Sequence, residues 1–72
     1  MSKFRQIDGG SQKGKIIRLY DDKCDICKKK HLEVVIDGVT KAGRWAWMCR
    51  ECHMKLGFGL GVGYGQKYRR IR

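Results

Sequence analysis

The stretch that decides the fold runs from residue 24 to residue 52 and reads CDICKKKHLEVVIDGVTKAGRWAWMCREC. It opens with one Cys-x-x-Cys pair and closes with another. Two residues between cysteines allow a tight turn to aim both sulfurs at one point, and two such knuckles supply the four thiolates of a tetrahedral Zn²⁺ site. Four protein ligands leave no position for an activated water, so the ion is expected to be structural. The predicted ligands are Cys24, Cys27, Cys49 and Cys52.

Two histidines offer alternative ligands. His31 follows Cys27 by four residues, so a site of three cysteines and one histidine also fits the spacing. His53 directly follows Cys52 and is expected to point away from an ion that its neighbour already binds. The all-cysteine site remains the prediction, with His31 or His53 as the alternative.

The start of the chain bears on how the cysteines are used. Residues 1–15 carry charges but no hydrophobic segment of the secretory kind, and no apolar run of about 18 residues occurs that would span a membrane. We therefore expect a cytoplasmic protein. In that reducing compartment, paired cysteines are more often metal ligands than disulfides or a redox motif.

Size and charge agree with a metal-stabilised module. The chain has 72 residues, too few for a large substrate-enclosing enzyme fold, and its 17 lysines and arginines against 7 acidic residues give a net charge of +10. Zinc binding is worth roughly 10–16 kcal/mol in small peptides, which matches or exceeds the roughly 5–15 kcal/mol stability of ordinary domains. The metal is expected to decide whether the chain folds.

Three segments are expected along the chain. Residues 1–14 combine glycine, serine and glutamine with scattered charges, which predicts a flexible basic arm. Residues 15–56 form the predicted zinc-ribbon domain. Residues 57–72 form a glycine-alternating strand or loop with a basic tail.

Strand signals lie before and between the cysteine pairs. They are residues 15–20 (KIIRLY), residues 31–37 (HLEVVID), which end at the turn signal Asp37-Gly38, and residues 44–48 (RWAWM). The predicted fold class is small, metal-stabilised and mainly β. It is a zinc ribbon with a short antiparallel sheet, two CxxC knuckles and at most a short helical turn after Cys52.

Trp45 and Trp47 are two residues apart, so in a strand their side chains share one face. One interpretation is that they cover the small core. The other is that at least one ring stacks on an unpaired base, worth ~1–3 kcal/mol per base. The sequence leaves both open.

Glycine occupies every second position of residues 57–65 (GFGLGVGYG). An extended backbone would place Phe58, Leu60, Val62 and Tyr64 on one face, as in an edge strand packed on the ribbon. A flexible docking segment is the other prediction. Nucleotide binding is disfavoured, because the run lacks the GK[ST] ending of a P-loop and the context of a dinucleotide-binding fingerprint.

Basic residues gather in two further places: three consecutive lysines follow Cys27, and residues 66–72 (QKYRRIR) surround an aromatic ring with cations. Such clusters suit the phosphates and bases of nucleic acid. The candidate nucleic-acid contacts are Lys28, Lys29, Lys30, Trp45, Trp47, Lys67, Tyr68, Arg69 and Arg70.

Residues 24–52 resemble a zinc-ribbon or zinc-knuckle domain, a module that serves in transcription factors, ribosomal proteins and adaptors alike. Residues 47–53 (WMCRECH), with the glycine run and residues 65–68 (GQKY), resemble small uncharacterised proteins of bacteriophages. This resemblance implies a phage accessory protein in the host cytoplasm.

The pieces CDIC, LEVVID and MCRECHMK are also similar to the zinc-holding frame of HNH nucleases. In that family a catalytic histidine follows the LEV strand, where this chain has Val35 and Ile36. Neither side chain activates water or binds a catalytic metal, so the resemblance implies a retained frame without nuclease activity.

Two functions follow as expectations. The first is non-enzymatic binding of DNA or RNA through the basic surface. The second is a protein-docking module or inhibitor that acts on the acidic surface of a host machine such as RNA polymerase, with residues 57–65 pairing with a partner's edge strand. A homodimer through an exposed edge is also compatible, and no membrane partner is expected.

Overall fold

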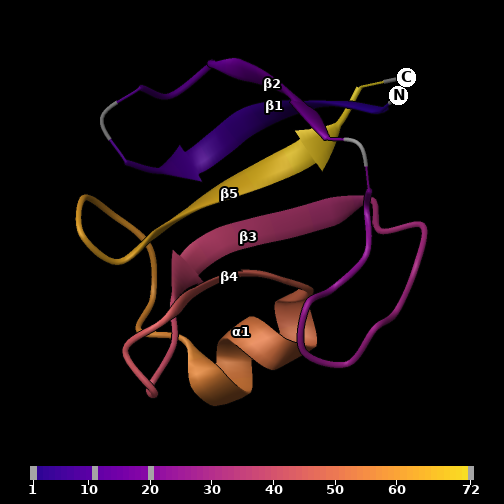
Figure 1. Cartoon of the computed structure of the whole chain (residues 1–72). Helices are drawn as coiled ribbons and strands as arrows, with labels where there is room; N and C mark the ends of the chain where they lie inside the picture. Colours follow the sequence, from indigo (N-terminus) through magenta and orange to yellow (C-terminus); the bar gives the residue numbers. More distant parts are fainter. Residues whose placement is uncertain (1, 11, 20, 72) are drawn as a thin grey trace.

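The computed structural model describes residues 2–10, 12–19 and 21–71. Its elements are β1 (Ser2–Gly9), β2 (Ile16–Leu19), β3 (Val34–Val39), β4 (Trp45–Met48), α1 (Arg50–Leu56) and β5 (Gly65–Arg70). The five strands form one antiparallel sheet in the order β2-β1-β5-β3-β4, which Figure 1 shows from top to bottom. The predicted small, mainly β fold is confirmed.

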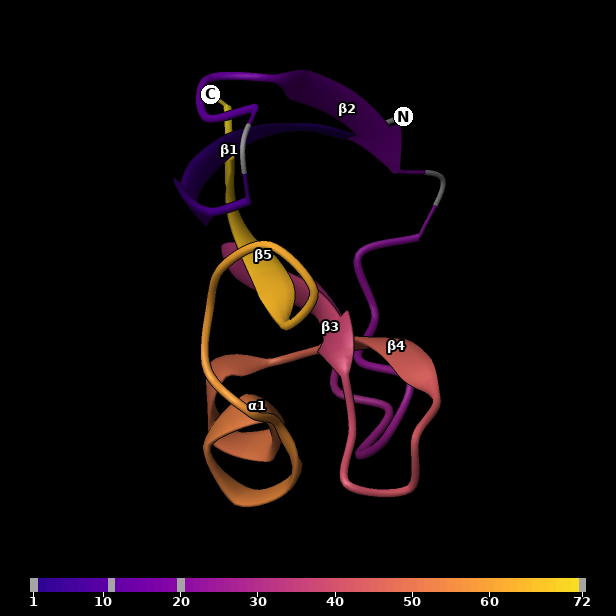
Figure 2. The ribbon, with the colours of Figure 1, turned by 90° about the vertical axis from the view of Figure 1, so that its left-hand side faces the viewer.

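The sheet consists of two hairpins joined by the last strand. β1 pairs with β2, β3 pairs with β4, and β5 lies between β1 and β3. Figure 2 shows the β1–β2 hairpin crossing above β5 at a steep angle, so the sheet is strongly curled. The expected short sheet between the cysteine pairs is therefore only the β3–β4 half of a larger one.

The expectation of a flexible arm over residues 1–14 is corrected by β1. Phe4 is fully buried and Gln6 is nearly so, while Lys3 and Arg5 are exposed on the other side of the strand. The charged residues that suggested an arm are the outward half of a strand whose inward half contains Phe4. Residues 1 and 11 lie outside the described part.

β3 runs through the turn expected at Asp37-Gly38. Gly38 is paired with Gly65 of β5, and a Cβ atom on Gly38 would lie 2.9 Å from the carbonyl oxygen of Tyr64. The glycine therefore permits a close approach of two backbones rather than a reversal. The chain turns later, where the N–H of Thr40 donates to the carbonyl of Arg44 at 2.7 Å.

Residues 57–64 form a loop and not the expected edge strand. Gly59, Gly61 and Gly63 have positive φ angles of 98°, 132° and 86°, which side-chain-bearing residues rarely adopt. Phe58 and Tyr64 are more than half exposed, so they do not pack on the tryptophans as a strand face would. The residues expected as a basic tail become β5, at the centre of the sheet, apart from Ile71, which follows the strand, and Arg72, which is not described.

Most of the core lies on the face of the sheet that carries Phe4, Val35 and Tyr68, whereas Met48, the register partner of Ile36, lies on the other face. α1 packs against β3 and β4. The core side chains of the strands are Phe4, Leu19, Val35, Met48 and Tyr68, joined by Leu32 and three cysteines. A helix of seven residues replaces the expected short turn after Cys52. It begins between the two cysteines of the second pair.

Candidate metal centre

The four predicted cysteine ligands come together in space. Their Sγ atoms all lie within 4.8 Å of one another, and those of Cys27 and Cys49 are 3.7 Å apart. Four sulfurs at about 2.3 Å from a tetrahedral Zn²⁺ would lie about 3.8 Å from each other. The cluster therefore has the donor atoms and nearly the spacing that such an ion needs.

The loop of residues 21–33 places the first pair. The backbone N–H groups of Ile26 and Cys27 both donate to the Sγ atom of Cys24, each at 3.4 Å. The turn closes where the N–H of Lys28 donates to the carbonyl of Cys24 at 3.1 Å, with Lys28 at a φ of 66°. This is the tight knuckle that the Cys-x-x-Cys spacing predicts.

Asp25 fixes this knuckle to β4, a role that sequence reasoning missed. Its N–H donates to the carbonyl of Trp47 at 2.8 Å, and its carboxylate accepts from the N–H of Trp47 at 3.1 Å. Because Trp47 is two residues before Cys49, these bonds set the distance between the two cysteine pairs. The only signal in the sequence was an acceptor side chain between two cysteines.

The second pair lies at a junction between strand and helix rather than in a knuckle. Cys49 is the N-cap residue of α1, and its side chain makes no capping hydrogen bond. The N–H of His53 donates to the carbonyl of Cys49 at 3.0 Å, which starts the helix and brings Cys52 back to the same side one turn later. Figure 1 shows the first turn of α1 beside the loop that carries the first pair.

The histidine alternatives are not part of the cluster. Among the described residues, the group that could hold a metal contains only the four cysteines. The Nε2 atom of His53 is 2.9 Å from the carbonyl oxygen of Gly59, where it fixes the glycine loop. His31 lines a hollow of about 320 Å³ next to Cys49.

The thiols differ in pKa because their surroundings differ. Burial would raise the pKa of Cys24, but N–H donors from Cys27, Cys49 and Ile26 lower it to about 6. Burial and the three neighbouring thiols raise the pKa of Cys52 to about 12. The backbone N–H of Lys29 donates to the thiol of Cys27 and lowers its pKa. The contacts of this thiol with Cys24 and Cys49, together with some burial, outweigh that donor and raise the pKa overall. One thiolate therefore forms readily, and further ionisation requires a cation.

Metal binding is expected to weaken as the pH falls. The raised pKa values of Cys27 and Cys52 mean that a cation must displace their protons near neutral pH, so affinity rises with pH. Below about pH 6 the thiolate of Cys24 also takes up a proton, and the metal affinity falls more steeply with pH. Dialysing the metal-loaded protein at pH values from 8 to 5 and measuring bound metal checks this. Constant metal content over that range would contradict it.

The aromatic candidates lie on the core face. Tyr68 is 6% exposed, and the ring of Trp47 packs against it with centroids 5.8 Å apart. Trp45 is 51% exposed, so of the three it is the ring most open to a base. Burial excludes the expected stacking role for Tyr68 and leaves Trp47 as a partly buried wall of the core.

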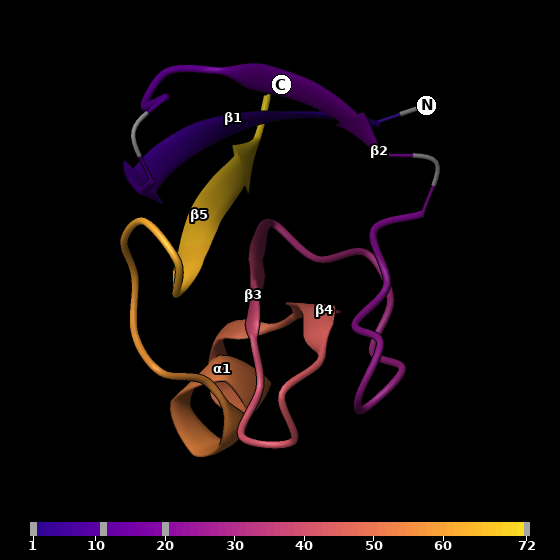
Figure 3. The ribbon, with the colours of Figure 1, turned by 60° about the vertical axis from the view of Figure 1, so that its left-hand side comes forward.

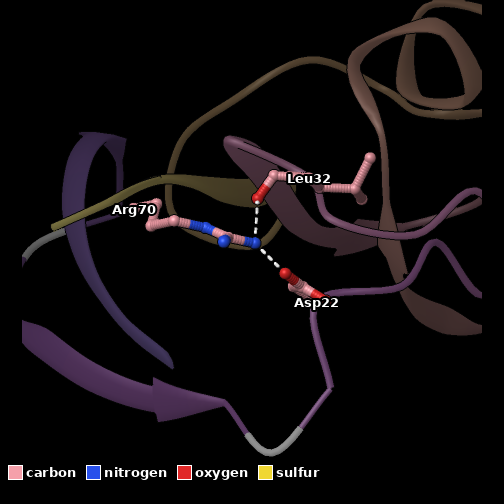
Figure 4. A network of polar contacts seen from close by, with 3 residues as sticks. All are labelled: Asp22, Leu32 and Arg70. Atoms are coloured by element: carbon pink, nitrogen blue, oxygen red, sulfur yellow. Dashed lines mark hydrogen bonds and ion pairs between the residues drawn. The ribbon is translucent and has the colours of Figure 1, made fainter. Parts of the chain in front are cut away.

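Arg70 is partly buried, with 24% of its side chain exposed, and its guanidinium is held by contacts within the protein instead of standing free as the expected phosphate contact. Its Nη2 atom forms an ion pair with Asp22 and donates to the carbonyl of Leu32 at 3.0 Å, as Figure 4 shows. Its guanidinium also lies over the ring of Phe4, 5.7 Å from the centroid. Arg70 thus connects β5 to both ends of the loop segment that contains the first cysteine pair.

The remaining cations separate into two groups. Lys28, Lys29 and Lys30 are exposed in the cysteine loop. Lys67 and Arg69 lie on the face of β5 opposite Tyr68, where Arg5 is the register partner of Arg69 and Lys3 is the partner of Arg18. We call the side chains of Lys3, Arg5, Arg18, Lys67 and Arg69 the basic face. Sequence reasoning missed Lys3 and Arg5 because residues 2–9 did not look like a strand. It also missed Arg18, whose strand joins this face only through its pairing with β1.

No family model, curated protein or solved structure matches this chain. The resemblances to phage proteins and to the HNH frame therefore gain no support from these comparisons. In the described part of the chain, no helix is both long and apolar enough to cross a membrane.

Proposed function

We propose that this protein is a zinc-stabilised, non-catalytic domain that binds nucleic acid through the basic face. The observation that carries the proposal is the cross-strand pairing of like charges. Arg5 lies directly opposite Arg69, and Lys3 directly opposite Arg18. Like charges in such positions destabilise a sheet, and a polyanion bound across them removes that penalty.

The surroundings of these pairs support the same conclusion. A hollow of about 340 Å³ adjoins the central arginine pair and is lined by Arg5, Ile7, Arg69, Arg70 and Ile71. Figure 3 shows β1 and β2 standing clear of α1, which lies below β3 and β4. Asp8 is the register partner of Lys67 at one end of the face, so a negative charge offsets the positive charge there. The positive potential is therefore stronger at Arg5 and Arg69, in the centre of the face.

The proposed role of the metal is structural. The cluster supplies four thiolates, the donor set of zinc sites that are closed to solvent molecules. Zinc would hold the cysteine loop against α1 and would leave no ligand position for catalysis. The three lysines of that loop add positive charge beside the basic face. Lys29 lines the same hollow as Val34, and Val34 is paired with Arg69 of the basic face in the sheet.

Binding is expected to fall steeply with salt. If the five cations of the basic face each neutralise one phosphate, affinity for double-stranded DNA drops roughly 500-fold between 50 and 200 mM salt. Fluorescence anisotropy with a labelled oligonucleotide, titrated with the zinc-loaded protein at several salt concentrations, measures this. Affinity that stays constant over that range would refute phosphate binding as the source of affinity.

A second candidate function is docking on a protein, and the glycine loop favours it. Phe58, Val62 and Tyr64 are 54%, 73% and 53% exposed, and Met54 of α1 is 83% exposed. Exposed apolar side chains on a loop fixed by His53 are typical of interaction surfaces. A pull-down from nuclease-treated lysate separates the two functions. A single protein partner that survives the nuclease, and is lost when Phe58 is replaced by serine, supports docking.

A further inference from the structure

Within residues 2–10, 12–19 and 21–71, the basic face contains no aromatic ring. Strand residues alternate between the two faces, so Phe4 and Tyr68 point away from it and into the core. Trp47 packs against Tyr68 on that same opposite side, and Trp45, two residues earlier in β4, shares its face. An unpaired strand bound on the basic face would therefore find no ring for its bases, although stacking supplies ~1–3 kcal/mol per base in single-strand binding.

The cations spread over three adjacent strands instead of forming a line. Arg18 belongs to β2, Lys3 and Arg5 to β1, and Lys67 and Arg69 to β5. Neighbouring strands are about 4.8 Å apart, so the face is about 10 Å wide. The minor groove of a DNA duplex is about 6 Å wide and the major groove about 12 Å. A face of this width reaches phosphates on both sides of a groove, whereas a single strand offers one line of phosphates.

The side chains between the cations are aliphatic. Ile16 is 51% exposed and Ile71 is 39% exposed, and Ile7 lines the hollow between Arg5 and Arg69. Isoleucine offers no hydrogen bond to a base edge but packs against sugars. This composition suits the repetitive backbone of a helix and does not discriminate among base pairs.

From these three observations we infer that the basic face binds the two sugar-phosphate backbones of a nucleic-acid duplex, independently of sequence. This inference rests on the proposed function and names its substrate class. Three aromatic residues of the described part are exposed, Trp45, Phe58 and Tyr64, and they take no part in this contact.

The test compares a labelled 20-base-pair duplex with a single strand of the same length, using zinc-loaded protein and fluorescence anisotropy at several salt concentrations. Arg5→Gln and Arg69→Gln remove charge from the centre of the face. Arg44→Gln is the matched control, because Arg44 is exposed in the turn between β3 and β4. Thermal unfolding of each variant shows whether the fold is retained.

We expect the duplex to bind about tenfold more tightly than the single strand, because only the single strand lacks its stacking partners. Each variant of the face should reduce the slope of log affinity against log salt by about 0.9, and Arg44→Gln should leave it unchanged. Equal or tighter binding of the single strand with quenched tryptophan fluorescence would overturn the inference while preserving nucleic-acid binding. Absence of binding to both oligonucleotides would overturn the proposed function itself, and unchanged slopes in both variants would overturn the assignment to this face.

Discussion

Removal of zinc with EDTA is expected to unfold the protein. Zinc coordination contributes roughly 10–16 kcal/mol in small domains, which is at least as large as the roughly 5–15 kcal/mol net stability of an ordinary fold. Without a cation, burial and mutual repulsion prevent all four thiols from ionising together, and the cysteine loop loses its attachment to α1. Far-ultraviolet circular dichroism and tryptophan emission should both change and should recover when zinc is added in excess.

Substitution of a ligand should act in the same way. Cys27→Ser is expected to lose bound metal and to unfold without EDTA. His31→Ala is the control, because His31 is exposed and lies outside the cluster, so its metal content should equal that of the wild type. A Cys27→Ser protein that stays compact and metal-free would contradict the central role of the ion.

Phe4→Ala is expected to cost about 3–5 kcal/mol of unfolding free energy in the zinc-loaded protein. The ring is fully buried in β1, against the core formed by Val35 and Tyr68, and it lies beneath the guanidinium of Arg70. Truncation leaves a cavity between the two hairpins. Urea denaturation with saturating zinc measures the loss.

Phe58→Ala makes the same chemical change at a ring that is 54% exposed, and its cost should be within about 0.5 kcal/mol. If residues 2–9 were a mobile arm, both variants would unfold at the same urea concentration. A midpoint that falls only for Phe4→Ala shows that β1 is an integral strand.

The sequence predicts the cysteine cluster well because its signal is local. Two residues between the members of each pair constrain the chain chemically, and runs of β-forming residues identified most of β2, β3 and β4. The start of α1 was missed because a helix of seven residues is too short to show periodicity. The first turn of α1 forms because Cys49 and Cys52 must both reach the cysteine cluster.

The central part of the sheet was missed because it depends on contacts that are distant in sequence. Gln6 occupies an inward position of β1 and breaks the alternation of apolar residues that would mark a strand. In β5, Arg70 occupies another inward position. A charged side chain is stable there because it contacts Asp22, Leu32 and Phe4. A sequence that places amide and guanidinium groups in a core resembles a solvated tail until its partners are known.

The antiparallel pairing of β1 with β5 also determines how the protein responds to tension. Phe4 is opposite Arg70, so residues 2 and 71 lie at the same end of this strand pair. A force applied through those two residues acts perpendicular to the strands and breaks the hydrogen bonds between them one after another. It does not load them all at once, as shear along the strands would. A domain stable towards denaturant would therefore yield at low force in an optical trap.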